Sequence, residues 1–482
     1  MTIFRAFATL TPLIALLAGC TVGPDYAGPS ARAPHAPAFV RAGDAPVTTD
    51  APAARWWEAL GDQTLDALVT RALAANPNVA IMQARLRQAR AALRVAKADE
   101  LPSANATALY AHARLPGLDL GQLDDNGNSG SGGNSTTDLN LYNLGFDASW
   151  EVDLFGGQRR GVQAARATTE AAQANIADAQ VSLSAEVVQA YVNLRDRQQR
   201  LILSNQSLTM QQRMLDLTRE RFGRGTASRL DVTQLQNQVD GTRADATPLN
   251  AERDAYLDEL ATLTGDEPGV LDATLTPARP IPLPPAQVAV GDPAALLQRR
   301  PDIRAAERTL AADTAKIGQA EAARFPKISF MGIVGLGGTS PSDLTKLDDF
   351  TALIAPQISW SFLDFGRNKA RVVQAEGVRD EAEAQYRAAV LSALRDAEDS
   401  LSRFRYRRMT VATLARGKAE ADVSVALSEQ RYKAGTTTLI DLLDTQRQQV
   451  AAEQSLSIAE AGLTGDFVAI QKALGLGWAP TP

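Results

Sequence analysis

Two short stretches of the chain carry acidic residues where a helix is expected to begin. Asp441 and Asp444 lie three residues apart, so both would lie on one face of that helix. The related stretch has Asp231 followed three residues later by Gln234. Acidic groups at a helix start are favoured by the helix dipole. This pattern favours an electrostatic role for the two carboxylates. The alternative is that they are ordinary acids at a helix start without a special role.

No catalytic set accompanies these acids. One Cys and two His exclude a disulfide framework and disfavour a Cys/His metal cluster. His35 and His112 lack ligand partners at helical spacing, so we expect them to be surface or wall residues. The glycine-rich segment 335–338 is too loose for a phosphate loop, and we expect a turn there. We therefore predict no enzyme activity, no cofactor and no metal. The 49 basic against 55 acidic residues also argue against a nucleic-acid partner.

The acidic stretches belong to a turn that the chain contains twice, 210 residues apart. Glycine can adopt the left-handed conformation that ends a helix, and a following Ser or Thr can cap the next one. Each copy therefore predicts the tip of a helical hairpin. The residues that define the two tips are Arg221, Gly225, Thr226, Ser228 and Leu230 in the first copy, and Arg431, Tyr432, Gly435, Thr436, Thr438 and Ile440 in the second.

The turn is part of a longer internal duplication. Asn76-Pro77 and Leu101-Pro102 recur 224 residues later as Arg300-Pro301 and Phe325-Pro326, whereas Trp150 and Phe155-Gly156 recur 210 residues later as Trp360 and Phe365-Gly366. Each half predicts the order helix, strand, loop, strand, long helix, tip, long helix. The halves span 56–270 and 300–475, with a Pro-rich crossing at 271–299 and a tail at 476–482. The expected helices are at about 76–100, 156–222, 229–264, 301–324, 366–432 and 439–475.

Apolar residues repeat every seven positions along both long helices. The rows are Val187, Leu194, Leu201, Leu208, Leu215 and Phe222, and then Ala397, Phe404, Val411, Val425 and Tyr432, with Lys418 interrupting the second. A seven-residue period favours left-handed coiled-coil packing, which we expect near both tips. Pro248 should bend the helix that returns from the first tip.

The N-terminus predicts a processed and lipidated chain. Residues 1–19 contain a short apolar run that is typical of a secretory signal. The segment 17–20 resembles a bacterial lipobox, in which Cys20 would become the lipidated first residue and its acyl chains a stable anchor. Thr21 in place of Asp implies sorting to the outer membrane. The Pro-rich strap 20–55 should lack a core of its own, and Trp56-Trp57 should dock the first helix on the body.

Four segments predict β-strands, at about 103–112, 141–153, 327–337 and 351–363. Two of them alternate clearly, with apolar residues such as Tyr142 and Trp150 on one face and polar residues such as Asp147 on the other. Strands of this length with one apolar face match transmembrane β-strands, and the alternative is a soluble, half-buried sheet. Pro356 removes a ladder hydrogen bond and suggests a local bulge.

Four strands cannot close a barrel, because about eight is the smallest ordinary size. An open sheet edge in lipid would leave backbone groups without partners. If the strands span a membrane, several chains must share one barrel, and three chains would supply twelve strands. The polar side would then face inward and line an aqueous duct.

Taken together, the segment 20–26, Trp56-Trp57, Arg300-Pro301-Asp302, the two Phe-Gly pairs and the two tips resemble those of the TolC-like outer-membrane factors. The similarity is to their lipoprotein branch, typified by OprM and NodT, and covers nearly the whole chain. The resemblance implies a mainly α fold with a small β part, which as a homotrimer forms a 12-strand β-barrel in the outer membrane continued by a helical α-barrel in the periplasm.

The resemblance also implies function and partners. It implies a passive efflux duct for drugs or small toxic molecules, which docks to a periplasmic adaptor and an inner-membrane pump of the resistance-nodulation-division type. Asp441 and Asp444 match the family's pore-narrowing carboxylates, with Asp231 as the first-copy equivalent. Three-fold symmetry would gather six carboxylates into a ring that favours cations. Thr437 stands where relatives often have a basic residue, so a tip lock through that charge is not expected.

Two other functions remain open from the sequence. An exit duct for type I protein secretion shares the fold, and the strap and lipobox favour small-molecule efflux over it. A periplasmic coiled-coil adaptor lipoprotein would also contain hairpins, but it does not predict two duplicated hairpins with four amphipathic strands.

Overall fold

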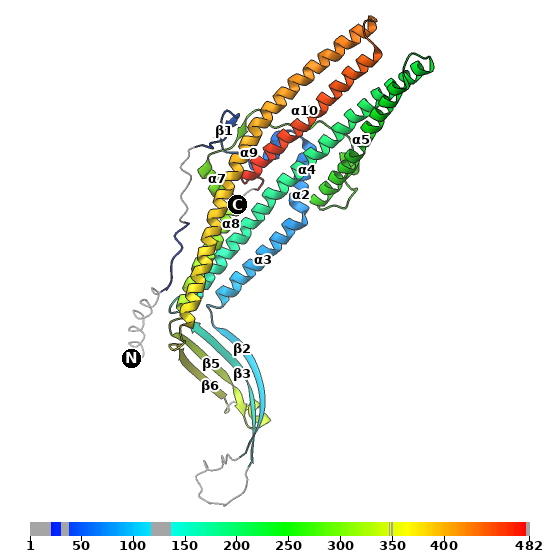
Figure 1. The fold of residues 1–482 in the computed structure, drawn as a ribbon. Coiled ribbons are helices and arrows are strands. Elements are labelled where there is room, and N and C mark those ends of the chain that lie inside the picture. The colour runs from blue at the N-terminus through cyan, green and yellow to red at the C-terminus, as the bar shows by residue number, and fades with distance from the viewer. Residues whose placement is uncertain (1–20, 30–37, 117–135, 347, 349, 479–482) are drawn as a thin grey trace, which may run out of the picture. The chain divides into compact units, whose positions relative to one another are not determined.

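The computed structural model describes residues 21–29, 38–116, 136–346, 348 and 350–478 (Figure 1). Cys20, His35 and the loop 127–135 lie outside these residues. Along the chain the elements are β1 (Val47–Thr48), η1 (Trp56–Leu60), α2 (Gln63–Ala75), α3 (Pro77–Ala98), β2 (Ser103–Pro116), β3 (Thr136–Val152), α4 (Gly157–Gly223), α5 (Arg229–Leu263), α6 (Asp272–Leu275), β4 (Val288–Ala289), α7 (Pro293–Arg299), α8 (Pro301–Ala322), β5 (Lys327–Gly338), η3 (Pro341–Thr345), β6 (Phe350–Ser359), α9 (Arg367–Lys433) and α10 (Leu439–Ala473).

The predicted fold class, mainly helical with a small β part, is confirmed. Each half repeats the same order of elements, α3-β2-β3-α4-α5 and α8-β5-β6-α9-α10. The chain forms two compact units. The first comprises Met1–Pro29, Gln88–Thr169 and Arg308–Glu383, and the second comprises Ser30–Arg87, Glu170–Glu307 and Ala384–Pro482.

The duplication extends to individual hydrogen bonds in the second unit. Asn76 donates from its side-chain amide to the carbonyl of Leu263 at 2.9 Å, at the end of α5. In the other half, Arg300 donates to the carbonyl of Ala473 at 2.8 Å, at the end of α10. Each half thus ties the residue before its first long helix to the last turn of its final helix, where carbonyl groups lack helical partners.

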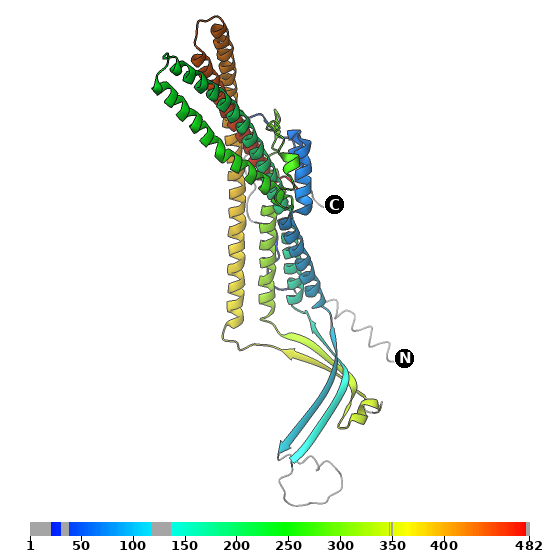
Figure 2. The same cartoon turned by 90° about the vertical axis from the view of Figure 1, so that its right-hand side faces the viewer.

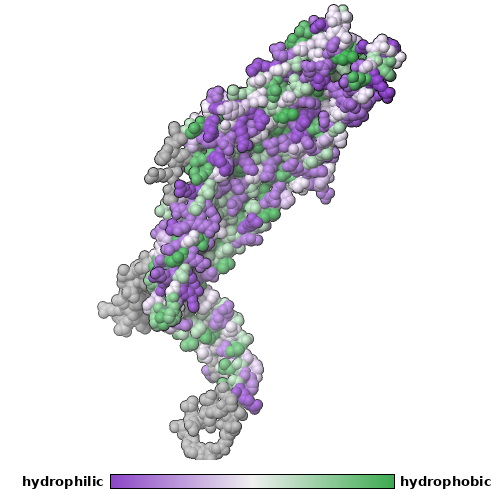
Figure 3. Space-filling model, viewed as in Figure 1, coloured by the Kyte–Doolittle hydropathy of each residue, from purple (hydrophilic) through white to green (hydrophobic). Residues whose placement is uncertain are grey.

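The core of the second unit is built from helices and from part of the strap. Trp56 and Trp57 are both buried, and Trp56 packs edge-on against Phe467 of α10 with ring centroids 5.8 Å apart. The strap also contributes, because Phe39 is buried in the same core and β1 pairs in parallel with β4. This part of the strap therefore packs in the body's core and is not merely extended. Hydrophilic residues dominate the helical face seen in Figure 3.

A buried polar network lies inside this core. The Arg195 side chain is fully buried and donates to the carbonyls of Leu275 and Pro277 at 3.1 and 2.8 Å. Arg195 also donates to the Tyr191 hydroxyl at 3.1 Å, and that hydroxyl donates to Asp62 at 2.5 Å. Burial raises the pKa of Tyr191 to about 12, with the Asp62 hydrogen bond as the next cause.

The seven-residue rows are buried to within one repeat of each tip. In α4 the row is buried at Val187, Leu194, Leu201 and Leu215, whereas Phe222 at the tip is 47% exposed. In α9 the row is buried at Ala397, Phe404 and Val425, and Tyr432 at the tip is 40% exposed. The heptad pattern therefore marks an apolar seam along both helices, and only its last position at each tip lacks cover within one chain.

The first unit contains a four-stranded antiparallel sheet in the order β2-β3-β5-β6 (Figure 2). Two predictions for this sheet are wrong. The glycine-rich segment 335–338 is not a turn but the end of β5, where a Cβ on Gly335 would lie 2.7 Å from the carbonyl of Leu144. Glycine therefore permits close approach of two strands here. Pro356 makes no bulge, since the register of β5 with β6 is continuous and the edge strand tolerates a missing N–H.

The strands also differ in length from the prediction. β2 extends to Pro116, past the predicted residue 112, and β3 begins at Thr136, before the predicted residue 141. β6 ends at Ser359, before the predicted residue 363. Among the described helices, none has a long enough apolar stretch to cross a membrane.

Candidate functional site

The first tip is closed by backbone and hydroxyl groups. Gly225 has φ +76° and donates its N–H to the carbonyl of Phe222 at 2.9 Å. Thr226 donates both its N–H and its hydroxyl to the carbonyl of Arg221, at 2.8 and 3.1 Å. The left-handed glycine and the following Thr thus satisfy carbonyl groups that the end of α4 leaves unpaired.

The second tip repeats this geometry. Gly435 has φ +75° and donates to the carbonyl of Tyr432 at 3.0 Å. Thr436 donates its N–H and its hydroxyl to the carbonyl of Arg431, at 2.9 and 3.1 Å. The shared Gly-Thr pair is therefore explained by helix termination, in which Arg431 takes part through its backbone carbonyl.

Both tips begin their second helix with a capping box. The Ser228 hydroxyl accepts from the N–H of Asp231 at 3.1 Å, and the Asp231 carboxylate accepts from the N–H of Ser228 at 2.9 Å. At the second tip, the Thr438 hydroxyl accepts from the N–H of Asp441 at 3.2 Å. The Asp441 carboxylate in turn accepts from the Thr438 N–H and from the hydroxyls of Thr438 and Thr437, at 3.1, 2.6 and 3.1 Å.

These caps keep both acids ionised. The N–H and then the hydroxyl of Ser228 lower the pKa of Asp231. The Thr438 hydroxyl, followed by the Thr438 N–H and the Thr437 hydroxyl, lowers the pKa of Asp441. Hydrogen bonds to a carboxylate favour its charged form. Each tip therefore carries a negative charge on a carboxylate that is held in place by the hydrogen bonds of its capping box.

Asp444 is held differently. Its carboxylate accepts two hydrogen bonds from Arg447, at 3.1 and 2.9 Å, and one from Gln448 at 2.9 Å. About half of each side chain of the Asp444–Arg447 pair is exposed. Sequence reasoning missed Arg447, although its spacing of three residues from Asp444 is the signal for such a pair. The first tip has Gln234 in the equivalent place and so lacks this pair.

The sequence matches the family model described as outer membrane efflux protein over residues 68–266 and 293–476. The chain belongs to the outer membrane efflux protein family. Nodulation protein T of Rhizobium leguminosarum bv. viciae is 30% identical, over 99% of this chain and 94% of its own length. Outer membrane protein OprJ of Pseudomonas aeruginosa is 32% identical, over 98% of this chain and 96% of its own length.

Solved structures extend the similarity to the fold. The outer-membrane channel OprN is 34% identical and superposes with a TM-score of 0.84, over 95% of this chain and 99% of OprN. The CmeC outer membrane channel of Campylobacter jejuni has a TM-score of 0.83 at 19% identity, over 96% of each chain. The predicted membership of the TolC-like channels is confirmed.

In this outer membrane efflux protein, the second tip adjoins a groove between α4, α5 and α10. Met210 and Met214 of α4 and Leu235 of α5 line it together with Asp441 and Asp444 of α10. The apolar side chains Leu230 and Ile440, predicted as tip residues, are 64% and 38% exposed. The tips thus present both charge and apolar surface to their surroundings.

The residues after Cys20 are fixed by one buried cation in the first unit. Arg160, which is 2% exposed, donates to the carbonyls of Val22 and Gly23 at 3.1 and 2.9 Å and to the Asp25 carboxylate at 2.8 Å. A Cβ on Gly23 would lie 2.4 Å from Cα of Gly318, so only glycine fits there. The start of the strap is therefore anchored beside the first turn of α4.

Proposed function

We propose that three copies of this outer membrane efflux protein form a passive duct, through which an inner-membrane pump expels small toxic molecules or drugs across the outer membrane. The observation that carries this proposal is the four-stranded sheet, which has too few strands to close alone, in a chain whose relatives are outer-membrane channels. A shared barrel would give every strand a partner.

The proposed partners are a periplasmic adaptor and a resistance-nodulation-division pump. Relatives are named antibiotic, toluene and solvent efflux pump outer membrane proteins, in Pseudomonas putida. These names support export of small molecules over secretion of polypeptides. The energy would come from the pump, because the duct itself has no catalytic role in this proposal.

We assign Cys20 as the lipidation site and the outer membrane as the destination. The hydrogen bonds of Arg160 to Val22 and Gly23 support an anchor that is held close to the first unit. Substituting Cys20→Ser should abolish incorporation of labelled palmitate, and persistent labelling would refute the assignment.

We assign the electrostatic gate chiefly to Asp444, with Asp441 as a fixed charge beside it and Asp231 as the weaker counterpart in the first tip. Asp441 and Asp231 are bound in caps, whereas Asp444 is held by an exposed pair that can exchange partners. The tip residues Leu230 and Ile440 are the proposed adaptor contacts, since exposed apolar side chains favour a protein partner.

An efflux assay in the host that carries the gene tests the function. Cells that lack this protein but retain adaptor and pump should accumulate a fluorescent efflux substrate such as ethidium, and the wild-type gene should restore export. Unchanged accumulation, together with loss of a secreted polypeptide, would instead indicate type I secretion.

A further inference from the structure

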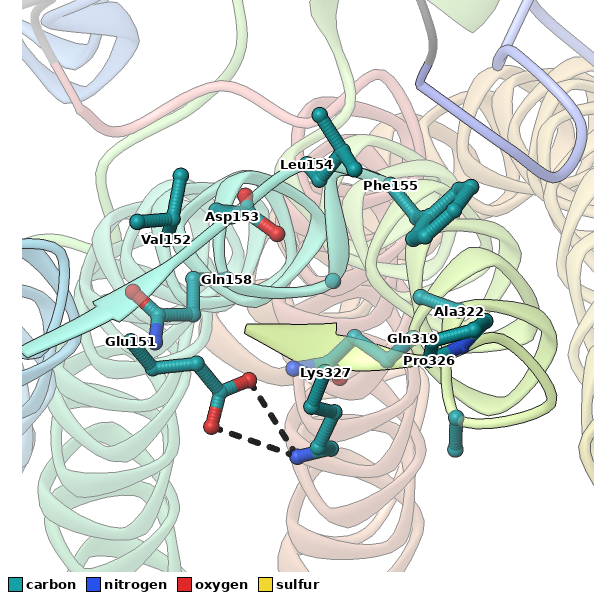
Figure 4. Close-up of a pocket in the computed structure, with 12 residues that line it drawn as sticks. Glu151, Val152, Asp153, Leu154, Phe155, Gln158, Gln319, Ala322, Pro326 and Lys327 are labelled. Atoms are coloured by element: carbon teal, nitrogen blue, oxygen red, sulfur yellow. Dashed lines mark hydrogen bonds and ion pairs between the residues drawn. The ribbon is translucent and has the colours of Figure 1, made fainter. Parts of the chain in front are cut away.

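A polar cleft lies in the first unit, where strands meet helices (Figure 4). Two segments form it, the joint between β3 and α4 and the joint between α8 and β5. Its volume of about 290 Å³ is at the small end of the range for ligand sites, so it suits a head group or a small metabolite. Its polar lining is contributed by Glu151, Asp153, Gln158, Gln319 and Lys327.

Close packing fixes the walls of this cleft. Phe155 and Phe325 stack with ring centroids 4.5 Å apart. A Cβ on Gly161 would lie 2.6 Å from Nε2 of Gln319, so this side-chain amide of α8 lies directly against α4. The cleft is thus formed by the fold before any ligand arrives, which lowers the entropic cost of binding.

Two charged groups of the cleft form an exposed pair. Nζ of Lys327 lies 3.2 Å from Oε1 and 3.5 Å from Oε2 of Glu151. The Lys327 and Glu151 side chains are 54% and 38% exposed. Exposed pairs contribute little to stability, so a ligand can open this one at small cost. Asp153 differs, because its carboxylate already accepts from the N–H and Nε of Arg159, at 2.8 and 3.3 Å.

One polar atom of the cleft lacks a partner. Oε1 of Gln158 is buried, and no described residue donates a hydrogen bond to it. A buried acceptor without a donor costs free energy, which the N–H group of a ligand would recover. Glu151 and Gln158 therefore favour an ammonium group with N–H donors, whereas Lys327 favours an oxyanion.

The internal duplication indicates that the fold does not require this charge pair. At the offsets of 210 and 224, Glu151 and Lys327 correspond to Ser361 and Ser103. The second half nevertheless has the same order of helix, strand, strand and helix as the first. The pair is therefore a property of this cleft and not of the joint between strands and helices.

We propose that this cleft binds a small zwitterion, with a primary ammonium group and an oxyanion a few atoms apart, as in phosphoethanolamine. The ammonium would displace Lys327 from Glu151 and donate to Oε1 of Gln158, and the oxyanion would pair with Lys327. A ligand with a single charge would open the pair and leave one member without a partner, so it should bind more weakly. Two sources carry this chemistry, a lipid head group and a free solute.

Saturation-transfer NMR on the full-length protein in detergent tests the site with soluble probes. Glycerophosphoethanolamine should bind saturably. Ethanolamine and glycerol 3-phosphate, which each carry one of its charges, should bind at least about 5-fold more weakly. Glycerophosphocholine should also bind more weakly, because its quaternary ammonium has no N–H to donate to Gln158.

Charge-removing variants should reverse these preferences. Glu151→Gln frees Lys327, so it should weaken binding of glycerophosphoethanolamine and strengthen that of glycerol 3-phosphate, each by at least about 3-fold. Lys327→Met should likewise strengthen ethanolamine. A variant that merely disturbed the fold would weaken all three probes. Glu321→Gln is the matched control and should change none, because Glu321 pairs with Arg324 of the same segment at 3.9 Å and does not line the cleft.

A second measurement separates the two sources. The protein is reconstituted into vesicles of equal parts phosphatidylethanolamine and phosphatidylcholine and extracted again, and its bound lipid is quantified by mass spectrometry. Enrichment of phosphatidylethanolamine on the wild type, lost in both Glu151→Gln and Lys327→Met, would identify a lipid head group. Saturable binding of glycerophosphoethanolamine without this enrichment would identify a free solute.

The proposal would be overturned by absence of glycerophosphoethanolamine binding, or by the same order of probe affinities in the wild type and both charge variants. Both measurements use purified protein, whether or not it conducts ions. Their failure would therefore leave the proposed duct standing, and failure of the duct would leave this site standing.

Discussion

At the scale of single residues, the two acids of the second tip have separate tasks. Asp441 is bound by the hydroxyl and N–H of Thr438, and its pKa is lowered by them. Asp444 is shared between Arg447 and Gln448. The sequence shows two carboxylates three residues apart, but only the structure separates the capping acid from the exposed pair.

The variant Asp444→Gln copies the residue that stands at Gln234 in the first tip. It should weaken block of the channel by multivalent cations roughly 10-fold, which corresponds to about 1.4 kcal/mol. The reason is the loss of one carboxylate per chain from the mouth. Titration of the current through single channels with a trivalent cation measures it.

Asp240→Gln is the matched control, because Asp240 forms a similar pair with Arg243, three residues on, along α5. Equal block in the wild type and in Asp444→Gln would refute the gate assignment.

The raised pKa of Tyr191 predicts that the free energy of unfolding depends on pH in the alkaline range. Its pKa is raised from 10.0 to about 12, so the neutral hydroxyl is favoured in the folded state. The contribution of the neutral Tyr191 hydroxyl to the free energy of unfolding is complete below pH 10 and is lost as pH rises toward 12. Denaturant unfolding measured from pH 9 to pH 12 should show this loss.

Tyr191→Phe removes the titrating group and should flatten that slope. Tyr386, whose pKa is raised by burial and by Glu307, leaves a residual slope in both proteins. An unchanged slope in the variant would show that Tyr191 does not titrate as proposed.

At the scale of elements, the tips depend on glycine in the left-handed region. Gly435→Ala should destabilise the hairpin by about 1 kcal/mol, since an L-residue is strained there. Gly417 lies inside α9, and a Cβ added there would have no neighbour within 4 Å, so Gly417→Ala should stabilise by about 0.5–1 kcal/mol. Hydrogen exchange of the amides of α9 and α10 measures both. Equal effects of the two substitutions would contradict this account of the tip.

The elements also show how far sequence reasoning reaches. Periodicity and the repeated turn sufficed for the order of helices and strands and for the position of both tips, because these signals are local. The role of Gly335 could not be predicted, since it depends on the close approach of Leu144 from another strand. The hydrogen bond of Tyr191 to Asp62 spans 129 residues, and no spacing rule indicates it. The pairing of Arg447 with Asp444, by contrast, could have been predicted from their spacing of three residues on one helix.

At the scale of the whole molecule, the internal duplication and the open sheet edges both favour a symmetric assembly of several copies. The two halves of the chain repeat one design, and its sheet leaves β2 and β6 with one partner each among the described strands. The chain belongs to the outer membrane efflux protein family, and in a barrel shared between copies both open strand edges would be paired. A lipidated periplasmic adaptor would leave these two edges unexplained.

The most direct test of the duct is conductance. Purified full-length protein, added to a planar lipid bilayer, should insert as trimers and give stable, cation-favouring ion currents without any energy source. Heat-unfolded protein is the control and should give none. Folded, trimeric protein that inserts and yet conducts no ions would contradict the account and favour a periplasmic scaffold.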